Sequence, residues 1–247
     1  MDALKLSVEA KKAKLEALRP LRADALDALR RHYDLELTWS SNAIEGNTLT
    51  MLETELVIEK GVTVGGKPLR DHLEALDHYE AVGFIRELAA GGTPIGEFVV
   101  RAIHDLVVRR SKPEIAGRYA DQPRLVRTET GRHVFPMPME VPALMGAFGG
   151  WLQSTIVGPD SAFEAHRRLV DIHPFNDGNG RTARLLMNLL LIRSGYPPVA
   201  VRPEDRLDYV RALAAAQAGD GTEAYGRLMF GRLDATLDDY LSLLDAG

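Results

Sequence analysis

Residues 171–188 read DIHPFNDGNGRTARLLMN, and this stretch decides how the chain is organised. Its glycine-rich part, 177–180, stands directly before an apolar run of helical period, so we expect a loop that opens a helix at Gly180. The free amides and positive dipole end of a helix N-terminus attract anions. Arg181 and Arg184 are three residues apart and project from one side of the first turn. The stretch therefore predicts a polyphosphate cradle.

Two more side chains of this loop carry ionisable groups suited to phosphate chemistry. Asp177 offers a hard carboxylate oxygen beside the expected phosphates, which suits Mg²⁺. His173, four residues earlier, titrates near neutrality and can take a proton from an attacking hydroxyl. Taken singly, these features are usual in turns, solvated helix faces and structural histidines. Their concentration within twelve residues favours the catalytic interpretation.

The composition excludes several classes of protein. The chain has 247 residues, of which 45% are hydrophobic and 26% charged, as is usual for a globular protein. Its net charge of −5 argues against bulk binding of nucleic acid or of an anionic membrane. The absence of Cys excludes disulfides, zinc thiolates and a cysteine nucleophile. Without a spanning apolar run or an apolar signal core, we expect a cytoplasmic protein with no nucleic-acid or membrane partner.

Helical periodicity dominates the chain. Residues 26–44 keep their apolar positions on one face, and Gly46 ends that helix. Thr50 and Glu53 form a capping box for a second helix that runs to about Gly61. Seven further helices are expected, at 69–90, 95–110, 142–153, 161–172, 180–194, 204–218 and 222–244.

One stretch departs from helical period. Residues 118–138 are rich in Arg, Thr and Pro, and Gly131 marks a turn between two short arms, 125–127 and 133–135. Pro20 interrupts the helical pattern near the N-terminus. We therefore expect an all-α fold with one small β-hairpin.

The same residues carry a family resemblance. Residues 173–184, HPFNDGNGRTAR, match the signature H-P-F-x-(D/E)-G-N-G-R-x-x-R of the Fic family at every defined position. Residues 41–46, SNAIEG, resemble its inhibitory motif (S/T)-x-x-x-E-(G/N), and residues 116–119, AGRY, resemble the start of its target-binding flap. The likeness spans roughly residues 35–230. It implies the all-α Fic fold, a helical core with a β-hairpin flap over the active site.

The resemblance also implies an organisation of the chain. It divides the sequence into an N-terminal helical segment at 1–34, an inhibitory helix with the following capped helix at 35–61, and a Fic core at 62–247. The core carries the flap at 118–138 and the C-terminal helices.

The activity implied is transfer of AMP from ATP to a Ser, Thr or Tyr hydroxyl of a target protein. By resemblance, His173 is the general base and Asp177 holds Mg²⁺ or Mn²⁺. Positions implied to hold the nucleotide are Gly178, Asn179, Gly180, Arg181, Arg184, Asn188, Tyr209 and Gln217. Of these, Arg184 reaches the γ-phosphate, Asn188 fixes the loop or contacts the nucleotide, and the last two contact adenosine. The flap residues expected to pair with the target are Leu125, Val126, Arg127 and Thr128.

Regulation is implied by residues 41–46. Ser41 and Glu45 are four residues apart and share a helix face. By resemblance, Glu45 pairs with Arg184 and keeps it from the γ-phosphate, and Ser41 holds the carboxylate in place. The likeness is to the class whose inhibitory helix precedes the signature in the same chain.

Several alternatives share this site. A hydrolase that removes AMP would use Glu45 to align a water, and another nucleotide monophosphate such as UMP would fit the same cradle. A non-enzymatic nucleotide-binding module would not need both His173 and Asp177. Self-modification and a homodimer agree with the resemblance, and the sequence does not identify the target protein.

Among the other histidines, we expect a structural position for His104 and surface positions for His72 and His78.

Overall fold

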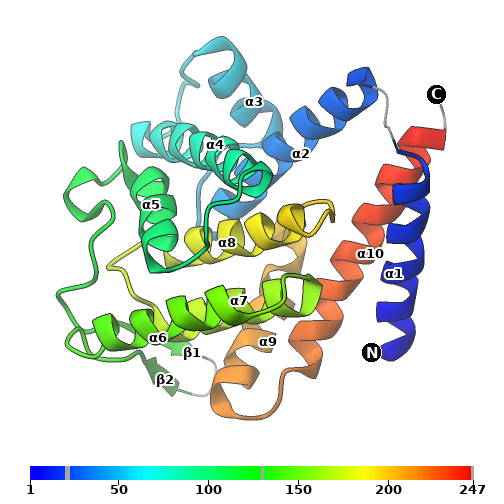
Figure 1. Cartoon of the computed structure of the whole chain (residues 1–247). Coiled ribbons are helices and arrows are strands. Elements are labelled where there is room, and N and C mark those ends of the chain that lie inside the picture. Colours follow the sequence, from blue (N-terminus) through cyan, green and yellow to red (C-terminus); the bar gives the residue numbers. More distant parts are fainter. Residues whose placement is uncertain (20–22, 129–130, 246–247) are drawn as a thin grey trace.

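The computed structural model describes residues 1–19, 23–128 and 131–245, and within these ranges the chain is mostly helical (Figure 1). The helices are α1 (Asp2–Ala17), α2 (Ala23–Ile44), α3 (Met51–Lys60), α4 (Leu69–Ala90), α5 (Glu97–Val108), α6 (Val141–Ser154), α7 (Pro159–Ile172), α8 (Asn179–Arg193), α9 (Arg206–Ala218) and α10 (Glu223–Asp245). Strands β1 (Leu125–Thr128) and β2 (Gly131–Val134) form the hairpin. The expected all-α fold is confirmed, and each expected helix begins and ends within three residues of the observed bounds. The Pro20 interruption lies outside the described residues.

Helix α8 is the centre of the molecule. It packs against α7, α4 and α5, and Figure 1 shows it between α4 and α7. Its apolar residues Leu185, Leu186, Leu189 and Leu190 are buried, because neighbours cover the helix on all sides. The loop 173–178 that leads into α8 is therefore held at a fixed place on the core.

The turn between α2 and α3 follows the sequence signals. Helix α2 ends at Ile44, and Gly46 takes the left-handed φ of +94° that glycine tolerates. The Thr50 hydroxyl accepts the Glu53 N–H at 3.2 Å, and the Glu53 carboxylate accepts the Thr50 N–H at 2.8 Å. The predicted capping box is confirmed, and it starts α3 a short turn after residues 41–46.

Helix α4 carries a row of buried polar side chains. Asp71, Glu74 and Asp77 stand three residues apart on a face that α2, α5 and α8 cover. Asp71 accepts the N–H and hydroxyl of Thr48 at 2.8 and 2.6 Å. The amide of Asn47 donates to the Glu74 carboxylate at 3.1 Å. The row thus ties the turn after α2 to α4.

The expected surface positions of His72 and His78 are wrong, since both are buried in α4. The His72 Nε2 accepts the N–H of Val64 at 2.8 Å, and its Nδ1 lies 2.9 Å from the Pro68 carbonyl. Burial lowers the pKa of His78 well below its usual value, and the charges of Arg184 and Arg181 add to that. A helix covered on several sides hides polar residues that periodicity assigns to solvent.

The first and last helices lie side by side. Figure 1 shows α1 and α10 running in the same direction. Lys11 pairs with Asp234 at 2.8 Å and with Asp238 at 2.6 Å, and Val8 is part of the main core. The expected boundary between residues 34 and 35 falls inside α2. Within the described ranges, no helix has the length and apolar character to cross a membrane.

Candidate active site

The signature loop begins with a strained residue. His173 ends α7 with a φ of +49°, and among the described residues it is the one non-glycine position with positive φ. An L-residue adopts this conformation at a cost, which the surroundings must balance. The N–H of His173 still donates to the Leu169 carbonyl at 2.9 Å, so the backbone is anchored while the ring turns out of the helix.

The ring of His173 is placed for work as a base. Its Nδ1 lies 3.3 Å from the Val170 carbonyl, which can only accept, so the proton is on Nδ1 and Nε2 keeps its lone pair. The ring stacks on Phe135, which follows β2, at 3.7 Å between centroids and 12° between planes. Burial lowers the pKa of His173 to about 4, although its bond to Val170 opposes this. The imidazole is therefore neutral at pH 7.

The loop after His173 is braced from inside the core. Phe175 is buried, and its N–H and carbonyl bond to the Asn179 side chain at 2.9 and 2.8 Å. His104 stacks on the Phe175 ring at 3.7 Å between centroids, and its Nε2 lies 3.0 Å from the Asp177 carbonyl. The side chain of Asn179 thus holds the loop and points away from the expected phosphates. The structural role expected of His104 is confirmed.

The residues expected to form a phosphate cradle lie together at the start of α8. Gly178 has a φ of +76°, and a Cβ there would come within 3.1 Å of the Val108 side chain, so glycine is required. Gly180 opens the first turn of α8, where free amides collect. Arg181 is buried beside them, 3.5 Å from the Glu74 carboxylate and 3.5 Å from the Asn42 amide oxygen.

Asp177 is the residue that could hold a metal. Its Oδ1 accepts the Gly178 N–H at 2.6 Å, and its Oδ2 is paired with Lys112. Burial opposes ionisation, but Lys112, Arg181 and the Gly178 amide lower the pKa of Asp177 below its usual value. In the described part of the chain, no cluster of three or more metal-ligating side chains exists. One carboxylate beside a phosphate cradle fits an ion that arrives with nucleotide phosphates.

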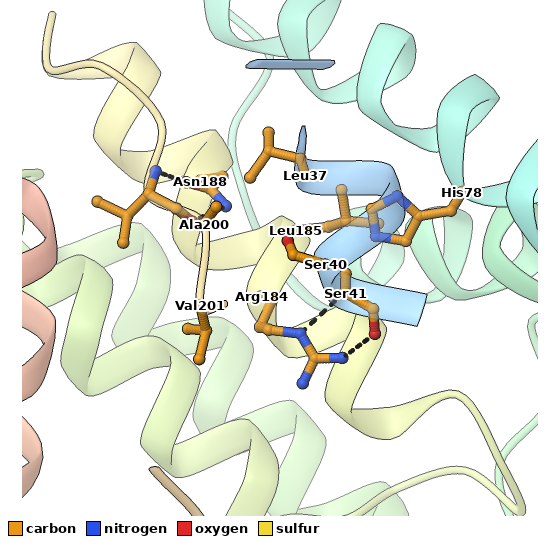
Figure 2. A pocket seen from close by; sticks show the side chains of 10 residues that line it. Leu37, Ser40, Ser41, His78, Arg184, Leu185, Asn188, Ala200 and Val201 are labelled. Carbon is orange, nitrogen blue, oxygen red and sulfur yellow. Dashed lines mark hydrogen bonds between the residues drawn. The ribbon is translucent and has the colours of Figure 1, made fainter. Parts of the chain in front are cut away.

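Arg184 is held by the end of α2. Its NH2 group donates to Glu45 Oε1 at 2.8 Å and to the Ser41 carbonyl at 2.8 Å. Its Nε donates to the Ser41 hydroxyl at 2.9 Å, and Figure 2 shows the arginine reaching from α8 to Ser41 on α2. The expected contact of Glu45 with Arg184 is present. The expected role of Ser41 is wrong, because its hydroxyl bonds the arginine and not the carboxylate.

The carboxylate of Glu45 also lies on the cradle. A Cβ at Gly180 would collide with Glu45 Oε1, so the carboxylate sits directly against the start of α8. Burial opposes its charge, but Arg184, with help from Arg181, lowers the pKa of Glu45 below its usual value. An ionised carboxylate therefore lies where the cradle would receive phosphate.

Three residues predicted to bind the nucleotide contact other parts of the protein. Tyr209 is buried close to Arg184, and its hydroxyl lies 2.7 Å from His166 Nε2. Asn188 holds the Val199 backbone, accepting its N–H at 2.7 Å and donating to its carbonyl at 3.0 Å. Gln217 lies close to the Asp171 carboxylate. The roles of these three residues as nucleotide contacts stay predictions, and the contacts observed are structural.

The hairpin flanks the catalytic loop. Leu125 pairs with Val134 and Val126 with His133 in antiparallel register, and all but His133 are exposed. The backbones of Arg127 and Thr128 complete β1, and the tip at 129–130 lies outside the described residues. The N–H of Phe135, whose ring stacks on His173, donates to the Arg124 carbonyl directly before β1. The pairing of this hairpin with a target stays a prediction.

Sequence reasoning missed Lys112 and Phe135. Lys112 contacts Asp177 from a turn 65 residues earlier in the chain, and no spacing rule links the two. Phe135 was assigned only to an arm of the hairpin, yet it stacks on His173. A bulky aromatic directly after an exposed strand was the one available signal.

Comparisons with known proteins agree with this geometry. The Fic/DOC family matches residues 94–191. "Protein adenylyltransferase Fic" of Nematostella vectensis is 39% identical over 209 residues, which cover 83% of this chain and 48% of that protein. The Drosophila willistoni protein of the same name is 34% identical over 95% of this chain and 47% of its own length. The chain thus spans about half the length of these curated relatives.

Solved structures match more completely. The crystal structure of a Fic domain containing signaling protein from Bacteroides thetaiotaomicron has a TM-score of 0.88 and 30% identity, with 97% of each chain covered. Fic-1 from C. elegans has a TM-score of 0.85 and 30% identity, over 98% of this chain and 71% of that one. On the signature, the fold and these relatives, the chain belongs to the Fic/DOC family.

Proposed function

We propose that this chain is a protein adenylyltransferase that its own helix α2 holds in a restrained state. The observation that carries the proposal is the 2.8 Å ion pair between Glu45 and Arg184 at the start of α8. His173 and Asp177 stand on the loop that leads into the same helix. The relatives named protein adenylyltransferase Fic, at 34–39% identity, support the reaction class.

The reaction needs a base and a place for the leaving group. The hydroxyl oxygen of the target attacks the α-phosphorus of ATP, a new P–O bond forms, and the bond to the bridging oxygen of the β-phosphate breaks. The neutral Nε2 of His173 accepts the proton of the hydroxyl. Pyrophosphate leaves with the electron pair of the broken bond. Positioning and charge neutralisation supply most of the acceleration in such transfers.

Charge neutralisation comes from the start of α8. The first amides of α8 and the guanidinium of Arg181 would bind the phosphate chain, and Arg184 would reach the γ-phosphate. Asp177 would hold Mg²⁺ or Mn²⁺, which supplies positive charge to the phosphate oxygens when bound. The cation would be shared between one carboxylate and the nucleotide.

Glu45 would restrain the reaction in two ways. It occupies the NH2 group of Arg184, which the γ-phosphate needs. Its negative charge also lies against Gly180, so it repels phosphate from the cradle. ATP could then enter only in an unproductive pose.

The test measures label transferred from ATP that is labelled on the α-phosphate. Purified wild type, Glu45→Gly and the Glu45→Gly, His173→Ala double variant are compared for self-labelling and for labelling of cell lysate. Glu55→Gly removes a carboxylate from the next helix, α3, and serves as the matched control. We expect strong labelling for Glu45→Gly alone, and none in excess EDTA. Equal labelling of the double variant would refute the role of His173.

Two arms separate the alternatives. UTP labelled on the α-phosphate shows whether UMP is transferred in place of AMP. Release of label from pre-labelled protein by wild type, but not by Glu45→Gly, would replace the transferase proposal with the hydrolase that uses Glu45.

A further inference from the structure

The expected metal ligand already has a cation beside it. Lys112 Nζ forms an ion pair with Oδ2 of Asp177. The other oxygen, Oδ1, accepts the Gly178 N–H at 2.6 Å and lies 3.8 Å from Arg181. Oδ2 is therefore the oxygen that an incoming ion would use, and the ammonium of Lys112 occupies its neighbourhood.

The backbone that carries Lys112 is fixed by a buried carboxylate. Asp77 of α4 is 0% exposed and accepts the N–H groups of Arg110 and Ser111 at 3.0–3.1 Å. It also accepts the Ser111 hydroxyl at 3.0 Å. The N–H of Lys112 then donates to the Val108 carbonyl at 2.7 Å. Only the flexible stem of the lysine is free to move.

The pair itself is open to exchange. The side chain of Lys112 is 31% exposed and that of Asp177 is 40% exposed, so water screens their attraction. Across the described residues, no group of three or more acidic or histidine side chains that could hold an ion forms at Asp177. A free divalent ion would therefore have to displace the ammonium of Lys112, and it would gain only the carboxylate of Asp177 as a ligand.

We infer that Lys112 is a resident cation that competes with the divalent metal for Asp177. The inference rests on the proposed function for the nature of the co-ligand, the phosphates of a nucleotide. A metal that arrives on a nucleotide brings phosphate oxygens, which complete its coordination and accept the released ammonium. Lys112 thus biases the site so that metal and nucleotide bind together.

The test measures Mn²⁺ binding to the nucleotide-free protein by electron paramagnetic resonance of unbound Mn²⁺. The variants are Lys112→Met, Lys112→Arg and Arg109→Gln. Arg109 is a matched control, because it carries the same charge three residues earlier but pairs with Asp105 and Glu80. We expect Lys112→Met to bind Mn²⁺ roughly two- to fivefold more tightly than wild type. Lys112→Arg and Arg109→Gln should bind as wild type does.

Three results would overturn the inference. Mn²⁺ binding to Lys112→Met that is no tighter than to wild type, including no binding at all, would show that the lysine does not compete. An equal gain in Arg109→Gln would make the effect one of general charge. A gain that persists after Asp177→Asn is added would place the ion elsewhere. No nucleotide or target enters this assay, so it stands apart from the labelling test: a gain in Lys112→Met without any AMP transfer would refute the proposed function alone.

Discussion

Replacing Glu45 with glycine should raise AMP transfer by roughly five- to thirtyfold. Arg184 is buried, whereas the side chain of Glu45 is 40% exposed, so the ion pair is only partly shielded from water. A charge-assisted hydrogen bond contributes about 1.5–3 kcal/mol when shielded, and screening reduces this to about 1–2 kcal/mol here. A free-energy difference of about 1.4 kcal/mol corresponds to a factor of ten in population, so the restrained state outnumbers the competent one by roughly five- to thirtyfold.

The gain is limited because Ser41 keeps its hold on Arg184. Its hydroxyl and carbonyl still accept two hydrogen bonds, at 2.9 and 2.8 Å, after the carboxylate has gone. Ser41→Ala combined with Glu45→Gly should therefore exceed Glu45→Gly alone. Glu45→Gln keeps the shape and an acceptor but loses the charge, so its rate should lie between wild type and Glu45→Gly.

The assay is the initial rate of label incorporation from α-labelled ATP at saturating Mg²⁺. Thermal melting followed by circular dichroism confirms that each variant is folded. If folded Glu45→Gly stays within about twofold of wild type, less than even an exposed pair can contribute, the competition for Arg184 does not limit the reaction.

Three other outcomes are expected. In the Glu45→Gly background, His173→Ala should lower transfer by about 10²–10⁴ while calorimetry still shows ATP binding, because the ring moves a proton and holds no phosphate; a lost affinity for ATP would contradict this. The rate of AMP transfer should stay level from about pH 8 to 6 and fall as the pH nears the His173 pKa of about 4, because a lowered pKa keeps the base neutral to lower pH. A fall in rate with its midpoint near pH 6.5 would contradict this expectation. Asp77→Ala should lower the free energy of unfolding in urea by about 2–4 kcal/mol, because it leaves the buried donors of the 110–111 turn unpaired; a change as small as that of Arg109→Gln would show that Asp77 is not needed.

Much of the fold could be predicted because its signals are local. Helical periodicity placed the helices within three residues, and the Thr50–Glu53 spacing was enough to predict a capping box. The signature loop was recognised from the fixed spacing of its glycines, its histidine and its arginines, and its phosphate chemistry stays a prediction. The ion pair of Glu45 with Arg184 came from the family resemblance, since no local rule joins residues 139 positions apart.

The parts that escaped prediction depend on which side chains meet across the core. A helical projection places Ser41 and Glu45 on one face, and only packing against α8 decides that the Ser41 hydroxyl bonds Arg184. His78 stands in a polar run, yet the helices around α4 bury it. Tyr209 is buried close to Arg184 because the face of α9 that it shares with Ala212 and Leu213 packs inward. Such buried polar contacts leave no periodic trace in a sequence.

The row of carboxylates on α4 sets the scale of motion by which the restraint can be relieved. Asp71 holds Thr48 and Glu74 holds Asn47, directly after the inhibitory motif, and Asp77 holds the turn beside Asp177. Peeling the end of α2 away from the site would break this row and leave buried charges without partners, at a cost of several kcal/mol. A rotation of the Glu45 side chain breaks one partly exposed ion pair. Under the proposed restraint, the contact with Glu45 would therefore be released on the timescale of side-chain rotation, nanoseconds or faster for exposed groups, and not on that of helix displacement.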